Sequence, residues 1–133
     1  MTGEAADRAA ITDLIRTFFA AFTSGPGCAE RLDNLPALFL PQAVLFRSPT
    51  VYDVDGFIAP RRELLLGGAL TDFREWATAG RTDLFGDIAQ HFCGYAKEGV
   101  QNGVPFTGAG RKSLQFVRTG AGWRISAVAW HDE

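Results

Sequence analysis

The sequence predicts an α+β domain with helices in the first half of the chain and long antiparallel strands in the second half. An apolar stripe at helical spacing occupies the N-terminal region, and after Gly68 no helical period returns. The length of 133 residues suits a single domain with one core. We therefore expect a curved sheet of about six strands around the first helix, with a pocket where sheet and helices diverge.

The helical stripe lies in residues 5–24. Its members recur every three or four residues and so share one face of an amphipathic helix: Ile11, Leu14, Ile15, Phe18, Phe19 and Phe22. The following run, Ser-Gly-Pro-Gly at 24–27, ends the helix because Pro26 cannot continue it and glycine tolerates a left-handed backbone.

A second, short helix is expected after a turn. Asp33 or Asn34 can cap it, and Pro36 falls in its first turn, where a missing N–H costs little. Its apolar side chains would face the core: Leu35, Leu38 and Phe39. Pro41 then stops the helix.

Two short strands follow, at residues 44–48 and 51–54, because both runs are rich in β-branched and aromatic residues. A third helix is expected over residues 61–66, closed by Gly67 and Gly68. Asp55 is the residue expected to cap this helix.

A long hairpin is predicted over residues 73–97, with Gly86 and Asp87 as a two-residue turn. This turn sets a register that pairs Phe85 with Ile88, Thr82 with His91 and Thr78 with Tyr95. Residues 98–110, which contain four glycines and a proline, are expected to form a flexible loop.

A final antiparallel pair is predicted over residues 113–118 and 123–130. Beyond it, the ending His131-Asp132-Glu133 is expected to be a solvated tail, since its spacing does not suit a metal site.

Charge and motif content exclude several classes of function. A net charge of -2, from 13 basic and 15 acidic residues, disfavours nucleic-acid binding. No apolar stretch reaches the ~20 residues of a membrane span, and the absence of a leader pattern predicts a cytoplasmic protein. Cys28 and Cys93 form no paired motif and are expected to be reduced thiols. No phosphate-binding loop, nucleophile elbow or dinucleotide motif occurs.

Three residues are candidates for acid–base chemistry. His91, one of 2 histidines, can act near neutral pH, unless it lies on the outer sheet face. Asp53 is a candidate pocket carboxylate or else an ordinary turn residue. Glu75 is a candidate base or else a partner in a cross-strand salt bridge.

Other residues are candidates for ligand binding. Arg47 can hold an anionic ligand or pair at the surface, and Tyr52 can donate a hydrogen bond or pack in the core. Trp76 competes with its neighbour Glu75, because alternation lets only one of them line the pocket. The amphipathic side chains Gln115 and Trp130 suit a pocket or an interface, and Phe18 and Phe22 supply aromatic surface.

The element order, together with Leu35–Phe39, the run Phe85–Gln90 and the ending Gly122–Glu133, resembles the nuclear transport factor 2-like superfamily. The likeness is greatest to small SnoaL-like or ketosteroid isomerase-like proteins. It implies a cone-shaped antiparallel sheet wrapped around three helices, an apolar pocket, no metal or organic cofactor, and a homodimer packed through the outer sheet face.

One departure from the superfamily's enzymes concerns the first helix. Ketosteroid isomerases place a tyrosine donor there, whereas this chain has Phe18, Phe19 and Phe22. A steroid isomerase would lose an oxyanion donor worth roughly 3–4 kcal/mol.

Three functional hypotheses follow. The first is a protein that binds a hydrophobic small molecule in an apolar pocket inside the cone. The second is a cofactor-free isomerase, dehydratase or polyketide-cyclase-like enzyme in which His91 and a carboxylate, Asp53 or Glu75, move a proton. The third is a protein-interaction module that uses the outer sheet face and has a filled interior.

Overall fold

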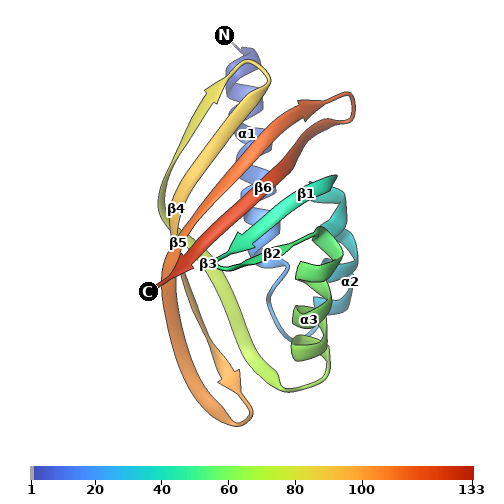
Figure 1. Cartoon of the computed structure of the whole chain (residues 1–133), viewed down its shortest axis with the longest axis vertical. Coiled ribbons are helices and arrows are strands. Elements are labelled where there is room, and N and C mark those ends of the chain that lie inside the picture. Colours follow the sequence, from blue (N-terminus) through green and yellow to red (C-terminus); the bar gives the residue numbers. More distant parts are fainter. Residues whose placement is uncertain (1) are drawn as a thin grey trace.

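The computed structural model describes residues 2–133, which form three α-helices and one six-stranded sheet (Figure 1). The helical elements are α1 (Thr2–Ala20), α2 (Cys28–Asn34), the 3₁₀ helix η1 (Leu35–Leu38) and α3 (Val54–Leu66). The strands are β1 (Phe39–Arg47), β2 (Thr50–Tyr52), β3 (Leu70–Phe85), β4 (Ile88–Gln101), β5 (Val104–Thr119) and β6 (Gly122–Asp132). The predicted α+β class is confirmed.

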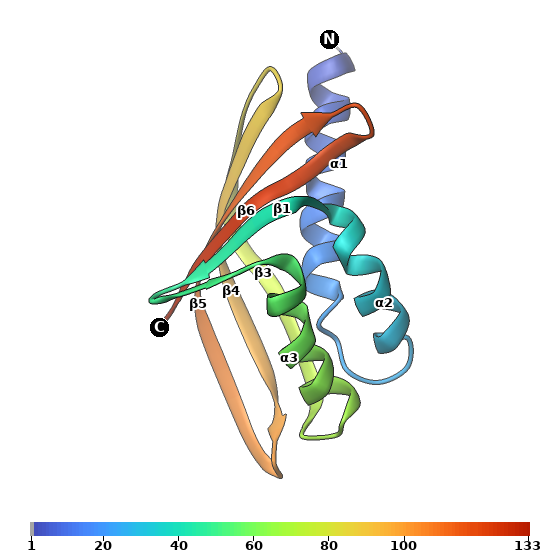
Figure 2. The ribbon, with the colours of Figure 1, turned by 45° about the vertical axis from the view of Figure 1, so that its right-hand side comes forward.

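The strands follow the order β2-β1-β6-β5-β4-β3. All neighbouring pairs are antiparallel except β1 and β6, which run parallel. The sheet curves strongly, and α1 runs along the upper part of its concave side while α2 and α3 lie beside its lower part (Figures 1 and 2). The helices therefore cover one face of the sheet only.

The α1 stripe forms the centre of the core. Five members are buried, namely Ile11, Ile15, Phe18, Phe19 and Phe22, and Leu14 packs against them as a half-buried side chain. Phe18 meets Phe22 edge-on, with ring centres 5.4 Å apart, and stacks on Phe57 of α3 at 6.4 Å. Each such side chain contributes about 1.5–3 kcal/mol by leaving water, so the stripe fixes α1 against both sheet and α3.

The predicted short helix is the 3₁₀ helix η1, which has Asn34 at its cap position and Pro36 in its first turn. Helix α2, which precedes it, was not predicted from the sequence. It starts at Cys28, directly after Gly27, whose φ of 82° only glycine adopts freely. Only Cys28 and Leu32 of this helix are buried. Two apolar positions are too few to show a helical period in the sequence. The expected burial of Leu35, Leu38 and Phe39 is confirmed.

Helix α3 also begins earlier, at Val54, and Asp53 is its cap. The Gly56 N–H donates to the Asp53 carboxylate at 2.7 Å. The expectation that Asp55 caps the helix is therefore wrong, because the helix includes the turn preceding Phe57.

The prediction of a flexible loop at residues 98–110 is wrong. Strands β4 and β5 continue through this stretch and pair without a register shift from Ile88 to Gln101. Asn102 and Gly103, at φ 51° and 81°, form the tight turn, and Asn-Gly is a preferred sequence for such hairpin turns. The glycine content of this stretch is typical of a loop, but the remaining glycines lie inside the paired strands.

The hairpin register around Gly86 and Asp87 is confirmed for Phe85 with Ile88 and for Thr82 with His91. Tyr95 pairs with Ala77 rather than Thr78, because the register shifts between Ala77 and Gly80. Such a bulge adds a residue to one strand and re-aims the side chains beyond it.

A polar cluster ties α1 to the last hairpin. Asp7 accepts two hydrogen bonds of 2.7 Å from Arg118 and one of 3.1 Å from Trp123. The hydrogen bond from Arg118, followed by the one from Trp123, lowers the pKa of Asp7 to about 2. The ionised carboxylate therefore stabilises the folded state.

We predict that Asp7→Asn lowers the midpoint of urea unfolding at pH 7. The stabilisation by Asp7 is fully present above its unfolded pKa of about 3.9, and it is lost as the pH falls toward the folded pKa of about 2. The gap between wild type and variant therefore closes between pH 4 and pH 2. Asp13→Asn, which breaks an exposed pair with Arg16, is the control; an equal effect of both variants would contradict this account.

Candidate functional site

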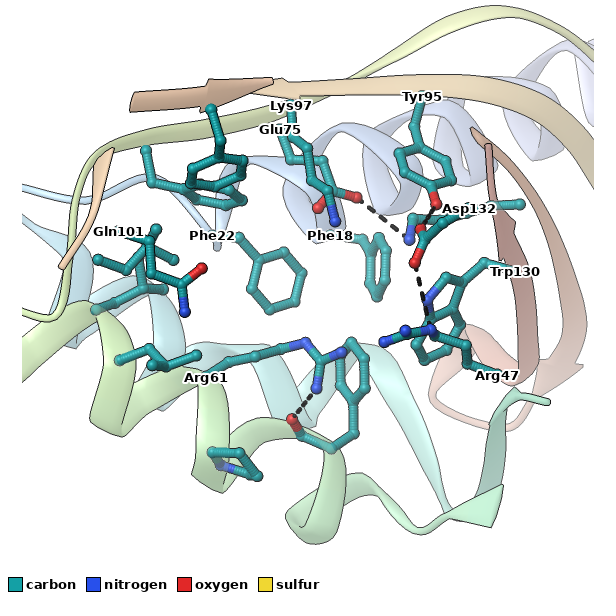
Figure 3. A pocket seen from close by; sticks show the side chains of 18 residues that line it. Phe18, Phe22, Arg47, Arg61, Glu75, Tyr95, Lys97, Gln101, Trp130 and Asp132 are labelled. Atoms are coloured by element: carbon teal, nitrogen blue, oxygen red, sulfur yellow. Dashed lines mark hydrogen bonds and ion pairs between the residues drawn. The ribbon is translucent and has the colours of Figure 1, made fainter. Parts of the chain in front are cut away.

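A pocket of about 320 Å³ lies between α3 and the lower part of the concave sheet face (Figure 3). Its apolar lining comes from both layers: Phe18, Phe22, Phe57, Pro60, Leu64, Leu65, Leu70, Phe73, Phe106 and Trp130. Its polar lining is Arg47, Arg61, Glu75, Tyr95, Lys97, Gln101, Lys112 and Asp132. The site is thus an aromatic and aliphatic cavity with several charged groups.

Strand alternation brings the polar groups to one face. Tyr95 and Lys97 are two residues apart on β4, and Lys112 and Asp132 come from β5 and β6. Tyr95 pairs with Gly110 of β5. A Cβ at Gly110 would collide with the Tyr95 phenol and with the His131 carbonyl, so glycine at this position lets the tyrosine ring cross the neighbouring strand.

The best-buried charges in the site form an ion pair. Lys112 Nζ lies 3.2 Å from the Glu75 carboxylate, and their side chains are 6% and 11% exposed. The ammonium also lies 4.2 Å from the centre of the Tyr95 ring and 4.8 Å from that of Trp130. Burial lowers the pKa of Lys112, and the Glu75 carboxylate opposes this shift.

A second cluster of polar side chains lies around Asp132. The Tyr95 hydroxyl donates to its carboxylate, and Arg47 Nε lies 3.2 Å from it. Burial acts to raise the pKa of Asp132, but the Tyr95 hydrogen bond and the nearby Lys97 and Arg47 charges outweigh it, so the pKa is lowered. Burial, aided by the Asp132 hydrogen bond, raises the pKa of Tyr95. Asp132 is therefore ionised and Tyr95 neutral at pH 7.

Arg61 approaches the pocket from α3. Its guanidinium lies 3.8 Å from the centre of the Phe57 ring and donates to the Phe57 carbonyl at 2.8 Å. Trp130 and Tyr52 flank the same guanidinium at 5.7 and 5.9 Å. Aromatic faces hold a cation in place by cation–π attraction.

The pocket contains five of the residues selected from the sequence: Phe18, Phe22, Arg47, Glu75 and Trp130. Tyr52 is not part of the lining but stacks on Trp130, with ring centres 6.2 Å apart. Trp76, next to Glu75, lies outside the pocket under the Arg74 guanidinium. Gln115 also lies outside, where it donates to Gln90.

The structure does not bring His91, Asp53 and Glu75 together. His91 lies on the same face of β4 as Tyr95 but four residues nearer the Gly86 turn, and its Nδ1 is 2.7 Å from Thr82 Oγ1. Burial lowers the pKa of His91. Asp53 caps α3. Of these residues only Glu75 lines the pocket.

Several residues that line the pocket were not predicted from the sequence: Arg61, Tyr95, Lys97, Gln101, Lys112 and Asp132. The expectation that Asp132 belongs to a solvated tail is wrong, because β6 extends to Asp132 and pairs it with Gly110. The detectable signal was alternation, since a strand that points Trp130 inward also points Asp132 inward.

Known structures share this architecture. Kfla4162 from Kribbella flavida is 17% identical, with a TM-score of 0.79 over 98% of this chain and 93% of that chain. A type 2 hexachlorocyclohexane dehydrochlorinase, LinA, is 16% identical, with a TM-score of 0.81 over 98% and 87%. A nuclear transport factor 2-like protein with a cystatin-like fold from Novosphingobium aromaticivorans is 19% identical, with a TM-score of 0.72 over 95% and 81%.

These likenesses show that the chain has the cystatin-like fold of nuclear transport factor 2-like proteins, as the resemblance implied. No protein-family model matches the sequence, and no curated protein matches it. None of the helices within residues 2–133 has the length and apolar character needed to cross a membrane. In the same range, no three His, Cys, Asp or Glu side chains gather as metal ligands.

We predict that Glu75→Gln lowers the free energy of unfolding by about 3 kcal/mol at pH 7, because it leaves the buried Lys112 cation without its counter-ion. Adding Lys112→Met should recover most of this loss, since a thioether has no charge to neutralise. Urea unfolding of the single and double variants measures both effects. Glu98→Gln, which breaks the exposed pair with Arg74, should cost less than about 1 kcal/mol. Equal losses for Glu75 and Glu98 would contradict the assignment.

Proposed function

We propose that this protein binds a hydrophobic small molecule in the pocket between α3 and the sheet. The observation that carries the proposal is the pocket volume of about 320 Å³, whose lining combines a cluster of aromatic and aliphatic side chains with several polar and charged ones. Ligand pockets begin at about 300 Å³ and combine apolar walls with a few convergent polar groups. Protein interiors are otherwise closely packed, so a module that only presents its outer surface has no need of this space.

A cofactor-free enzyme is the second candidate, and one observation favours it. The pocket holds a proton donor and acceptor pair in Lys112 and Glu75, and a second pair in Tyr95 and Asp132. One structural neighbour is named as a hexachlorocyclohexane dehydrochlorinase, which supports chemistry on an apolar substrate in this fold. Acid–base work in this pocket would use these four groups rather than His91.

Binding of the neutral fluorophore N-phenyl-1-naphthylamine tests the first candidate. We expect saturable fluorescence enhancement that Leu64→Trp reduces at least tenfold, because the indole fills the pocket that Leu64 lines. The matched control is Leu66→Trp, on the same helix but 46% exposed and outside the pocket. No saturable binding, or equal losses in both variants, would contradict the proposal.

We also propose that two copies associate through the convex sheet face. This face carries exposed apolar side chains, among them Val44, Phe46 and Phe92. A shallow groove there is lined by Phe46 and Phe92 together with the oppositely charged Arg111 and Glu133. A two-fold dimer sets one patch against its own copy, so a patch with both charges is complementary to itself.

Light scattering after gel filtration tests this association. Phe92→Glu should convert a dimer to a monomer, because it places a second negative charge in the apolar groove beside Glu133. Phe85→Glu is the control, since Phe85 is 84% exposed at a hairpin tip and outside the groove. A monomeric wild type, or a Phe92→Glu variant that remains dimeric, would contradict the proposal.

A further inference from the structure

The pocket carries a positive charge balance that the whole chain does not. Four of its lining side chains are basic and two are acidic: Arg47, Arg61, Lys97 and Lys112 against Glu75 and Asp132. The chain as a whole has a net charge of -2. The excess of positive charge is therefore confined to the pocket.

Both acidic groups are already engaged. Glu75 pairs with Lys112 at 3.2 Å. Asp132 pairs with Arg47 and accepts the Tyr95 hydroxyl. Across residues 2–133, no carboxylate lies within ion-pair distance of Arg61 or Lys97. These two cations are the part of the site that has no counter-ion.

The position of Lys97 explains why it stays unpaired. It is the cross-strand neighbour of Glu75, which would ordinarily favour a Glu–Lys pair. The Glu75 carboxylate binds the more deeply buried Lys112 instead. The stem of Lys97 crosses β5 over Gly108, where an added Cβ would lie 2.7 Å from Lys97 Cε. Gly108 thus leaves room for Lys97 to reach the pocket.

Arg61 reaches the pocket from the opposite wall, on α3 (Figure 3). One of its N–H groups donates to the Phe57 carbonyl, and the ring of Phe57 supports the guanidinium plane. A guanidinium has five donors in a planar fork that matches a carboxylate. Arg61 therefore has donors to spare in a pocket whose apolar lining includes Phe22 and Leu64.

Half-buried cations without a counter-ion are costly, because they lose hydration and gain no partner. Burial is the largest influence on the Arg61 guanidinium and lowers its pKa, while Glu75 and Asp132 act on it only through space. A bound anion would supply the missing partner to both walls at once. An apolar body attached to that anion would fill the remaining volume.

From this unpaired Arg61 and Lys97 on facing walls of an aromatic pocket, we infer that the ligand is an amphipathic carboxylate. Its anionic group lies between Arg61 and Lys97, and its apolar body lies against Phe18 and Phe22. This inference rests on the proposed function, because it names the class of molecule that the pocket binds.

Three ligands with one naphthalene body and different polar ends test the inference: 1-naphthaleneacetate, 2-(1-naphthyl)ethanol and 2-(1-naphthyl)ethylammonium. Isothermal titration calorimetry at low salt should show the acid binding about tenfold more tightly than the alcohol, as one charge-assisted contact of about 1.4 kcal/mol requires. The ammonium compound should bind most weakly. Added NaCl should weaken the acid and leave the alcohol unchanged.

Variants that remove one charge test whether the preference for the acid depends on Arg61 and Lys97. Arg61→Met and Lys97→Met should each reduce the acid-to-alcohol affinity ratio at least threefold. Arg16→Met removes the same charge from a side chain that is 70% exposed on α1 and outside the pocket, and it should leave the ratio unchanged.

The possible results distinguish a failure of the carboxylate inference from a failure of the small-molecule pocket. Equal affinities for acid and alcohol, both reduced by Leu64→Trp, would overturn the carboxylate and leave the small-molecule pocket standing. An acid preference that survives both Arg61→Met and Lys97→Met would also overturn it. Absence of binding by all three ligands, and by N-phenyl-1-naphthylamine, would overturn the pocket and the carboxylate together.

Discussion

The buried ion pair between Glu75 and Lys112 is the interaction on which the rest of the site depends. A lysine ammonium that is almost fully enclosed requires a counter-ion, and Glu75 supplies it from β3, on the other side of β4 from Lys112. This engagement leaves Lys97 without its cross-strand partner. The same ammonium lies against Tyr95, whose hydroxyl binds Asp132. The buried Lys112 charge thus determines which polar groups of the pocket are paired and which, like Lys97, are not.

The fold makes room for these charges by filling only part of its concave side. Helix α1 packs along the upper part and α3 lies over the lower part (Figure 2), where the pocket of about 320 Å³ lies between α3 and the sheet. Gly108 and Gly110 lie on the inward face of β5, where side chains would block Lys97 and Tyr95. Long paired strands with small inward residues therefore provide the floor of the pocket.

The sequence was informative wherever one regular period covered a whole element. The α1 stripe and the Gly86-Asp87 turn were predictable because each depends on local spacing. The continuation of β4 and β5 through residues 98–110 was not, because glycines inside a paired strand have the composition of a loop. His91 looked like the natural proton carrier, but its distance from the pocket depends on strand length and curvature, which local patterns do not encode. Asp132 was missed for a different reason, because the end of the sequence was expected to be a tail although β6 continues through Asp132.

Arg61 and Lys97 face each other across the pocket, and the inferred anion binds between them. A crystal structure of the protein grown with 1-naphthaleneacetate tests it most directly. The account predicts the naphthalene ring against Phe18 and Phe22, with the carboxylate within hydrogen-bond distance of both the Arg61 guanidinium and the Lys97 ammonium. A ligand bound only on the convex face, or one whose carboxylate points away from both cations, would contradict the claim.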